Sequence, residues 1–325
     1  MKVIIPVAGK GTRLYPHTYT RPKPLVRVAG KPILGHILDK LEKRDIEELI
    51  FITGAMADQL KEYVETHYRF KTSYIEQSVP KGPAHAVYLA RERVEKDLLI
   101  IYVDTVFETD LDVLQSTDSD GLIWVKEVED PRRFGVVVLN GKQIVKLIEK
   151  PVDPISTLAQ IGMYYFKEGP WLFQAIGEMM ERGLMTKGEY FLPEAFEIML
   201  RQGARLEAPL AQGWYDCGTP ETLLETNRIL LQNGYRKVIK TENSVIISPV
   251  YIEDGVTVVG SVIGPYVSIA ENARIMNAIV RDSIISEHAV VEDVLLNRSL
   301  IGKHAVVKGS FKALNVGDSS QIWDE

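Results

Sequence analysis

The chain has 325 residues, of which 46% are hydrophobic and 25% are charged, with a formal net charge of −6 and a single cysteine, Cys217. A chain of this length usually exceeds one hydrophobic core, so two domains are expected. The acidic balance argues against a general nucleic-acid binder, and no apolar run approaches the roughly 20 residues that span a bilayer. One cysteine excludes an internal disulfide framework and a cysteine-based zinc site, which suits a cytoplasmic location.

The first two thirds of the chain alternate β-branched runs with amphipathic helical patterns. The runs predict strands at 3–7, 48–53, 72–75 and 98–103. The patterns between them predict helices at 32–44, 56–66 and 82–95. This alternation is typical of a parallel sheet with helices on both faces.

Beyond residue 120 the order of elements becomes mixed. Strands are predicted at 121–128 and 162–166, and a hairpin joins 135–139 to 143–149 across Asn140-Gly141. Three helices are predicted, at 171–181, 193–201 and 219–233.

From about residue 245 the chain becomes a series of short steps with an aliphatic residue every five or six positions. Ile269, Ile285 and Ile301 are spaced by 16 residues, and a second such series lies six residues further on. Three short strands per turn with stacked aliphatic residues predict a parallel β-helix of four or five coils. The hexapeptide steps resemble the left-handed β-helix of the hexapeptide-repeat proteins. We therefore expect domains at 1–240 and 241–325.

The first 38 residues contain seven lysines and arginines and no acidic residue. They surround the loop Gly9-Lys10-Gly11-Thr12-Arg13, which directly follows the predicted strand 3–7. Glycines let backbone N–H groups approach phosphate oxygens closely. The loop lacks the third glycine of a Rossmann fingerprint and the Gly-Lys-Ser/Thr order of a P-loop. Taken alone, it is equally compatible with a tight strand-to-helix turn.

Together with the residues that follow it, the loop resembles the signature of the sugar-1-phosphate nucleotidyltransferases; these residues are Leu14, Pro16, Thr18, Arg21-Pro22-Lys23-Pro24 and Lys31-Pro32. Within that family, the chain most resembles the glucose-1-phosphate thymidylyltransferase-like members. The resemblance covers residues 1–235. It implies a Rossmann-like α/β domain with a mixed, mainly parallel sheet, followed in this chain by a short left-handed β-helix. It also implies that Arg13 and Lys23 hold the triphosphate. The nucleotide-binding positions that it implies are Ala8, Gly9, Gly11, Thr12, Arg13, Lys23, Gln77 and Gly82.

The segment 76–86 resembles the base-reading loop of the pyrimidine-specific members of that family. Gln77 offers a donor and an acceptor to the Watson–Crick edge of uracil or thymine, and Gly82 lets the backbone approach the base. Pro83 and His85 depart from the commonest form of the motif. The alternative is a polar surface turn that begins a helix.

Two aspartates match the metal-binding positions of the family. Asp104 ends the apolar strand 98–103, where α/β sheets bind ligands, and Asp216 lies in a segment resembling Trp-x-Asp-x-Gly-Thr. The resemblance implies that this pair holds Mg²⁺, with waters and phosphate oxygens completing the octahedron. Many relatives have glycine where Val103 stands here. Either aspartate is also a common cap of a helix or turn.

Four residues match the sugar side of the family's pocket. Gly135 and Gly162 would allow close approach, Glu149 would accept hydrogen bonds from sugar hydroxyls, and Lys150 would neutralise the sugar phosphate. On its own, Glu-Lys-Pro at a strand end is an ordinary charged turn.

The resemblance implies transfer of a nucleoside monophosphate from an NTP to a sugar 1-phosphate, giving an NDP-sugar and pyrophosphate. Gln77 favours dTTP or UTP, and glucose 1-phosphate is the favoured acceptor. The candidate catalytic residues are Arg13, Lys23, Asp104, Lys150 and Asp216.

Two alternatives remain open. The chain could be a regulatory or scaffold subunit that binds these ligands without turnover. His288 and His304, at equivalent places in the repeat, could serve an acetyltransferase site as in bifunctional relatives, although the repeat turn alone explains them. The expected partners are small-molecule substrates and further copies of the chain bound through the β-helix, with no nucleic acid and no membrane.

Overall fold

A computed structural model describes residues 1–153 and 155–309. The chain forms two compact units. One contains Met1–Val26 and Lys31–Leu223, and the other contains Arg27–Gly30 and the chain from Leu224 onward. Within the described residues, none of the helices combines the length and the apolar character needed to cross a membrane.

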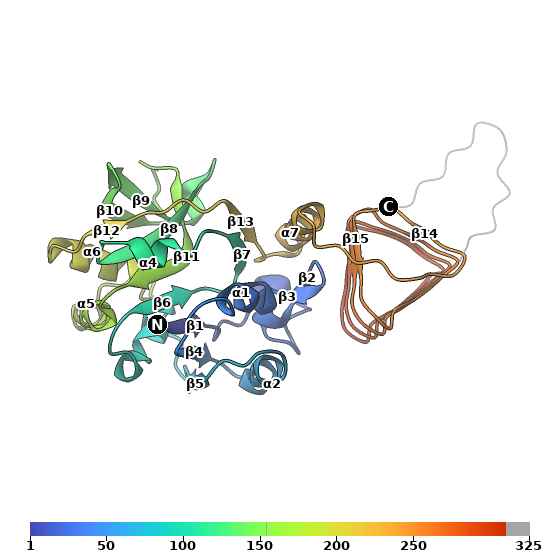
Figure 1. Ribbon diagram of the computed structural model, residues 1–325, viewed down its shortest axis with the longest axis horizontal. Helices are drawn as coiled ribbons and strands as arrows, with labels where there is room; N and C mark the ends of the chain where they lie inside the picture. The colour runs from blue at the N-terminus through green and yellow to red at the C-terminus, as the bar shows by residue number, and fades with distance from the viewer. Residues whose placement is uncertain (154, 310–325) are drawn as a thin grey trace. The chain divides into compact units, whose positions relative to one another are not determined.

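Nine strands form the central sheet of the first unit (Figure 1), namely β1 (Lys2–Pro6), β4 (Glu48–Thr53), β5 (Thr72–Glu76), β6 (Leu98–Ile101), β8 (Gly121–Glu127), β9 (Gly135–Asn140), β10 (Gln143–Glu149), β11 (Leu158–Phe166) and β12 (Leu206–Glu207). Their order is β5-β4-β1-β6-β11-β8-β12-β10-β9. The first four strands in this order are parallel, whereas β11 runs antiparallel to both β6 and β8. The sheet is therefore mixed, with its parallel half built from the N-terminal β-α-β units.

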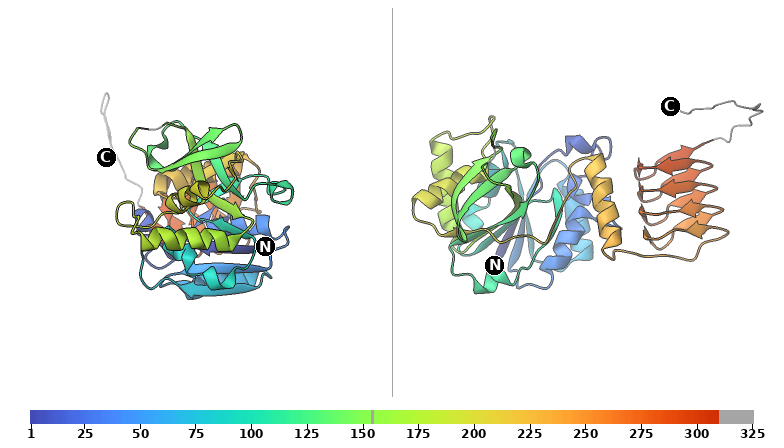
Figure 2. Two further views of the ribbon diagram at one scale, coloured as in Figure 1. Left: turned by 90° about the vertical axis from the view of Figure 1, so that its left-hand side faces the viewer. Right: turned by 90° about the horizontal axis from the view of Figure 1, so that it is seen from above.

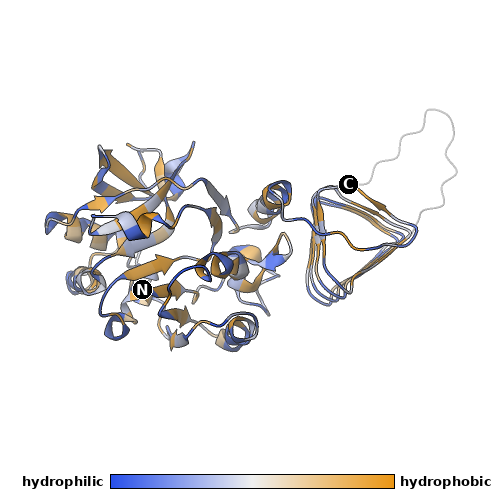
Figure 3. Ribbon diagram, viewed as in Figure 1, coloured by the Kyte–Doolittle hydropathy of each residue, from blue (hydrophilic) through white to orange (hydrophobic). Residues whose placement is uncertain are grey.

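Helices cover this sheet and close its core, namely α1 (Ile33–Leu41), α2 (Ala57–His67), α3 (Pro83–Tyr88), α4 (Val113–Ser116), α5 (Gly169–Glu181) and α6 (Leu192–Arg201). Ile4 and Ile50 share one buried cluster with α3, α5 and α6, while their neighbours Val3, Ile5 and Phe51 are fully buried on the opposite face. Burial on both faces explains why these strands are continuous apolar runs, which Figure 3 shows in orange.

Four shorter strands lie outside the central sheet. β2 (Arg27–Val28) and β3 (Lys31–Pro32) follow the glycine loop in the chain. β7 (Thr105–Glu108) pairs antiparallel with β13 (Gly213–Asp216). The sequence analysis did not predict β7 or β13, because each is only four residues long and its partner lies far away in the chain.

The second unit contains the C-terminal part of α7 (Pro220–Gln232) and a parallel β-helix, whose coils are stacked in Figure 2. Three sheets of four parallel strands make up the helix, in the orders β14-β17-β20-β23, β15-β18-β21-β24 and β16-β19-β22-β25. The strands are β14 (Val245–Ile246), β15 (Val250–Ile252), β16 (Thr257–Val259), β17 (Val262–Ile263), β18 (Val267–Ile269), β19 (Arg274–Met276), β20 (Ile279–Arg281), β21 (Ile284–Ile285), β22 (Val290–Glu292), β23 (Leu295–Asn297), β24 (Leu300–Ile301) and β25 (Val306–Lys308).

The 16-residue period predicted from the aliphatic residues is confirmed by the register of the strands. Ile269 pairs with Ile285, and Ile285 pairs with Ile301. In the first coil the step is one residue longer, since Ile252 pairs with Ile269. The predicted fold class, a Rossmann-like mixed sheet followed by a short left-handed β-helix, is confirmed.

Two predicted elements differ at one end by four residues or more from those in the structure. The helix expected at 82–95 ends at Tyr88, because the chain then turns to bury Ala90 and Val94 before β6 begins. The strand expected at 162–166 begins at Leu158, and its pairing with β8 contains an irregularity between Gln160 and Tyr164. The helix was predicted too long because the residues after Tyr88 have high helix propensity. The strand was predicted too short because Gly162 suggested its beginning.

Candidate active site

The glycine loop and Lys23 form one local structure. The loop leads from β1 into the 3₁₀ turn η1 (Thr12–Leu14), and Gly11 adopts a left-handed backbone with φ of 63°. The Thr18 hydroxyl donates a hydrogen bond of 2.8 Å to the Gly11 carbonyl. A Cβ at Gly11 would lie 3.1 Å from the Lys23 Cβ. The absence of a side chain at Gly11 therefore allows Lys23 to pack against the loop.

The two predicted metal-binding aspartates lie at the same end of the β7–β13 ladder. Asp216 pairs with Thr105, and the backbone N–H of Cys217 donates to the carbonyl of Asp104 at 3.0 Å. The Asp216 carboxylate accepts a hydrogen bond of 2.8 Å from the backbone N–H of Gly218. The tertiary fold thus brings these distant residues together.

Arg13 lies beside the second of these aspartates. A Cβ built on Gly218 would lie 2.8 Å from Asp216 Oδ1 and 3.2 Å from Arg13 Nη2. Leu14, the next residue, is fully buried and anchors the turn that carries the guanidinium. The basic loop and the aspartates therefore belong to one site.

Gln77 follows β5 directly and faces the start of α3. Its Nε2 donates to the Gly82 carbonyl at 3.2 Å and lies 3.0 Å from His85 Nδ1. Burial and the nearby Lys81 lower the pKa of His85, so the ring is neutral at pH 7 and its Nδ1 can accept the hydrogen bond. With its amide group engaged, Gln77 has its carbonyl oxygen left as an acceptor.

Gly82 packs against the backbone of Tyr190, a contact that the sequence did not indicate. Its φ is 107°, and a Cβ there would lie 2.6 Å from both the backbone N and the O of Tyr190. The backbone N–H of Tyr190 donates to the Lys81 carbonyl, and the N–H of Ala84 donates to the carbonyl of Tyr190. The close approach that the structure requires at Gly82 is to this segment of the protein.

We expect Gly82→Ala to lower the free energy of unfolding by more than the roughly 1–3 kcal/mol of backbone strain alone, because the new methyl group also collides with Tyr190. Gly183→Ala is the matched control: its φ is 63°, but a Cβ there meets no atom within 4 Å. Urea unfolding midpoints measure both changes. Equal losses in the two variants would contradict the predicted collision.

The predicted sugar side gathers at the end of the β9–β10 hairpin. Gly135 pairs with Glu149, and Lys150 Nζ lies 3.2 Å from Glu149 Oε1 and 4.6 Å from the centroid of the Phe191 ring. Burial raises the pKa of Glu149, although the nearby Lys150 opposes this shift. The hairpin therefore places a buried carboxylate and a cation side by side.

Gln160 on β11 is a candidate that the sequence analysis missed. The residue is 6% exposed, and both polar atoms of its carboxamide lack a hydrogen-bond partner among the described residues. A Cβ at Gly135 would lie 2.9 Å from Gln160 Nε2 and 2.8 Å from Glu149 Oε2. Buried polar groups are rarely left unpaired except at binding sites. The signal available in the sequence was a glutamine inside an otherwise apolar strand.

Tyr102 and Tyr164 connect the aspartate pair to the sugar side. Burial raises the pKa of both hydroxyls, and the nearby Asp104 and Glu149 carboxylates raise it further. A Cβ at Gly162 would lie 3.0 Å from the Tyr102 Cβ. The Tyr102 hydroxyl has no hydrogen-bond partner within the part of the chain that the structure describes. The predicted residue Gly162 therefore packs against a tyrosine that lies between the two groups of candidates.

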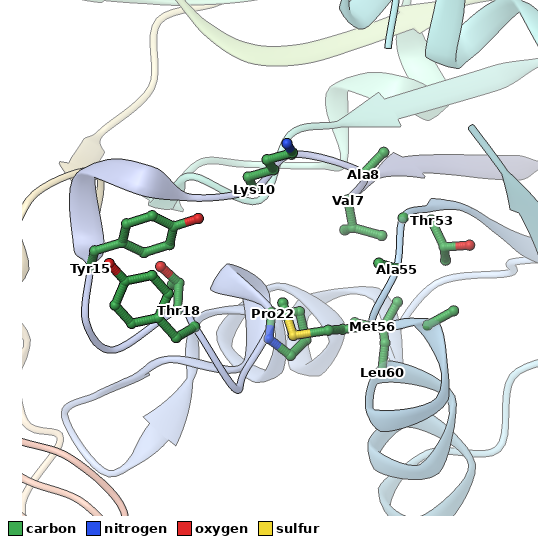
Figure 4. Close-up of a pocket in the computed structure, with 14 residues that line it drawn as sticks. Val7, Ala8, Lys10, Tyr15, Thr18, Pro22, Thr53, Ala55, Met56 and Leu60 are labelled. Carbon is green, nitrogen blue, oxygen red and sulfur yellow. The ribbon is translucent and has the colours of Figure 1, made fainter. Parts of the chain in front are cut away.

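A cavity of about 300 Å³ lies beside the glycine loop (Figure 4). Ala8, Gly9 and Lys10 of the loop line it, together with Thr53 at the end of β4 and Met56 in the turn before α2. Of the predicted nucleotide-binding positions, only Ala8 and Gly9 line this cavity, and the two aspartates do not.

The residues present suit a magnesium ion better than a transition metal. Among residues 1–153 and 155–309, no group of three or more histidine, cysteine, aspartate or glutamate side chains could hold a metal ion. Asp104 and Asp216 supply two hard oxygen donors instead, and Mg²⁺ commonly takes its remaining ligands from substrate phosphates and water. The donor set therefore fits Mg²⁺ bound together with a nucleotide.

Comparison with known proteins places the chain in a family. Residues 2–233 match the family described as Nucleotidyl transferase. The chain belongs to this family. It is 36% identical over 259 residues to the protein named Bifunctional protein GlmU of Methanocaldococcus jannaschii, covering 78% of this chain and 61% of that protein. It is 30% identical over 313 residues to a glucose-1-phosphate thymidylyltransferase of Streptomyces griseus, covering 88% of this chain and 87% of that enzyme.

Among solved structures, a Bacillus anthracis protein in complex with sucrose aligns with this nucleotidyl transferase family member at a TM-score of 0.60 and 26% identity. The alignment covers 70% of this chain and 94% of the solved one. This chain spans less than two thirds of the length of the archaeal bifunctional relatives that it matches, since it covers 61–62% of each of them.

Proposed function

We propose that this chain transfers a nucleoside monophosphate from an NTP to a sugar 1-phosphate, releasing pyrophosphate. The observation that carries the proposal is the position of Arg13. Its guanidinium and Asp216 Oδ1 flank Gly218, while Lys23 packs on the same loop. A basic loop joined to paired aspartates is suited to a magnesium-bound triphosphate.

The reaction needs no side-chain nucleophile. A phosphate oxygen of the sugar 1-phosphate forms a bond to the α-phosphorus, and the bond from that phosphorus to the bridging oxygen breaks, so that pyrophosphate leaves with the electron pair. Arg13 and Lys23 stabilise charge on the triphosphate, and Lys150 orients the attacking phosphate. Bringing two polyanions into line provides most of the acceleration in such transfers.

Asp104 and Asp216 are the residues that would hold Mg²⁺. When bound there, the ion supplies positive charge at the phosphate oxygens. Asp216 ends β13, and Asp104 directly precedes β7 and accepts the backbone hydrogen bond from Cys217, so the β7–β13 ladder keeps the two backbones fixed relative to each other. The ladder therefore positions the carboxylates before the nucleotide binds.

Gln77 supports uracil or thymine as the base. Its Nε2 is engaged with Gly82 and His85, so its Oε1 is the group available to the ligand. An acceptor at this place suits the N3–H of uracil and thymine, whereas N3 of cytosine is itself an acceptor. We therefore propose dTTP or UTP as the nucleotide.

Glu149, Gln160 and Lys150 support a sugar phosphate as the second substrate. The Glu149 carboxylate accepts hydrogen bonds from sugar hydroxyls, and the unpartnered carboxamide of Gln160 can both donate and accept. Lys150 lies 3.2 Å from Glu149, so one cation and one acceptor are presented together. Glucose 1-phosphate is the acceptor that we favour.

We expect the KM for the sugar 1-phosphate to fall as the pH rises through the raised pKa of Glu149, by at most about tenfold per pH unit, because only the ionised carboxylate accepts hydrogen bonds on both oxygens. The free energy of unfolding changes in the unfavourable direction over the same pH range. Burial raises the pKa in the folded state, so the folded chain binds more protons and this contribution to stability is lost as the pH rises through that window.

Steady-state kinetics between pH 5 and pH 8 test this prediction. Glu149→Gln is the control, because the substrate phosphate titrates near pH 6 and this component persists in the variant. Indistinguishable KM profiles for the native enzyme and the variant would rule out the predicted role of Glu149.

The proposed reaction is tested by measuring pyrophosphate release from each of five NTPs with a panel of sugar 1-phosphates. We expect release with dTTP or UTP and glucose 1-phosphate, dependent on Mg²⁺. Release from no pair would favour the alternative, a regulatory or scaffold subunit that binds these ligands without turnover.

The role of the β-helix is a separate proposal. We propose that it joins copies of the chain, because aliphatic residues point outward along one of its sheets, with Val245 58% exposed and Leu295 73% exposed. His288 and His304 stack at 4.9 Å between ring centroids, and both have a left-handed backbone. This geometry is that of a repeated turn, and an acetyltransferase site stays the lesser alternative.

A further inference from the structure

An arginine-lined cavity lies at one corner of the β-helix, within the second compact unit. Its volume is about 410 Å³, which is in the range of small-molecule sites. Arg281 and Arg298 line it from successive coils, and Arg228 lines it from α7. None of these residues belongs to the candidate active site.

The corner is built from equivalent positions of the repeat. Asp282 and Arg298 are 16 residues apart, and both have a left-handed backbone, with φ of 44° and 49°. Arg281 ends β20 and pairs with Asn297 at the end of β23. The repeat therefore stacks polar and charged side chains in a column where the strands turn.

The charges in this cavity are not balanced. Arg228 Nη2 pairs with Asp282 Oδ2 at 2.6 Å, which offsets one arginine. Neither the Arg281 nor the Arg298 guanidinium forms an ion pair with any described residue. Glu225 acts electrostatically on Arg228 but does not line the cavity. Two arginines without an ion-pair partner among the described residues thus line one cavity of a chain whose net charge is −6.

Polar atoms in the wall of the cavity are also unsatisfied. Asp282 is 7% exposed, and its Oδ1 has no hydrogen-bond partner within the described ranges. The same holds for Nε of Arg228, whose guanidinium lies 5.2 Å from the centroid of the Tyr266 ring. Incompletely paired buried polar groups are costly. Of these two atoms only the Arg228 Nε–H suits a bound anion, because an ionised carboxylate only accepts hydrogen bonds.

We propose that this corner binds a phosphorylated sugar or a similar small phosphomonoester. A phosphate dianion matches the guanidiniums of Arg281 and Arg298, since a guanidinium can bind phosphate oxygens bidentately. The amide of Asn297 and the hydroxyl of Tyr266 are the neighbouring groups that suit sugar hydroxyls. The proposal concerns a second binding site and does not depend on the reaction proposed for the active site.

Isothermal titration of the full chain with glucose 6-phosphate at constant ionic strength tests the proposal. Arg281→Gln combined with Arg298→Gln should weaken this binding by about 10- to 100-fold, because each change removes charged hydrogen bonds to the phosphate. Arg274→Gln is the matched control, since Arg274 is exposed on β19 in another sheet of the same helix. Any binding of glucose 6-phosphate in the active site contributes the same heat in the native chain, the double variant and Arg274→Gln.

The expected result is weakened binding in the double variant and native binding in Arg274→Gln. Titrations with inorganic phosphate and with glucose measure separately how the phosphate group and the sugar of glucose 6-phosphate contribute to binding. Phosphate should also lose affinity in the double variant, and glucose alone should not bind. Unchanged affinity in the double variant, equal losses in Arg274→Gln, or glucose binding as tightly as glucose 6-phosphate would each overturn the proposal. Circular dichroism verifies that the exposed substitutions leave the fold intact.

Discussion

Asp216→Asn is expected to reduce turnover by about 100-fold or more while the chain stays folded. Asparagine keeps the shape of the side chain, and its carbonyl oxygen can still accept the hydrogen bond from Gly218. The substitution removes the negative charge, which weakens a hard-cation site and leaves the adjacent Arg13 without that charge. Pyrophosphate release at saturating substrates, measured across a magnesium titration, gives both the rate and the metal dependence.

Asp104→Asn should have the same effect, since Asp104 directly precedes β7 and its backbone lies next to Cys217, the residue after Asp216. Asp118→Asn is the control, because Asp118 is exposed and its backbone carbonyl, which the substitution keeps, accepts a hydrogen bond from Arg205. The thermal midpoints of all three variants should stay near the native value. Near-native turnover with Mg²⁺ in either active-site variant would refute the metal-binding proposal.

Arg13→Ala is the second change with a large expected effect, a fall in turnover of about 100- to 1,000-fold. The guanidinium would contact the triphosphate most strongly as charge develops at the α-phosphorus, so kcat should fall more than the affinity for the sugar 1-phosphate. Arg13→Lys should recover only part of the loss, because a lysine cannot bridge two phosphate oxygens. Single-turnover kinetics with labelled NTP separates binding from chemistry.

The matched control for Arg13 is Arg182→Ala. Arg182 follows α5, is half-exposed and pairs with Glu178 at the surface. Its loss should leave kcat unchanged. If Arg13→Ala raised the KM for both substrates equally without lowering kcat, the proposed contact with the transition state would be wrong.

Local patterns in the sequence predicted much of the fold. The β4 and β10 strands lie at the residues predicted, because buried parallel strands and a hairpin around Asn140-Gly141 have strong local signals. The 16-residue period of the β-helix was equally visible, since each coil repeats the same buried positions. Elements with weak local signals were missed, as β7 and β13 show.

Some residues of the candidate site were likewise predicted from the sequence, and others were missed. The motif residues Arg13, Lys23 and Glu149 could be named from the resemblance to the nucleotidyltransferase signature, because each stands in a short contiguous segment. The role of Gly82 in packing against Tyr190 could not, since that contact joins segments far apart in the chain. Gln160 was also missed, because a single polar residue within a strand has meaning only when its surroundings are known to be buried and unpaired.

The sequence by itself determined the longer strands and helices of the first unit, the stacking period of the β-helix and the basic character of the glycine loop. These properties depend on residues that are near one another in the chain, through periodicity and backbone conformation. Only the tertiary structure decided that Arg13 lies beside Asp216, that the backbone of Asp104 contacts Cys217, and that three arginines meet at one corner of the β-helix. Such contacts depend on packing between distant segments, which no local pattern encodes.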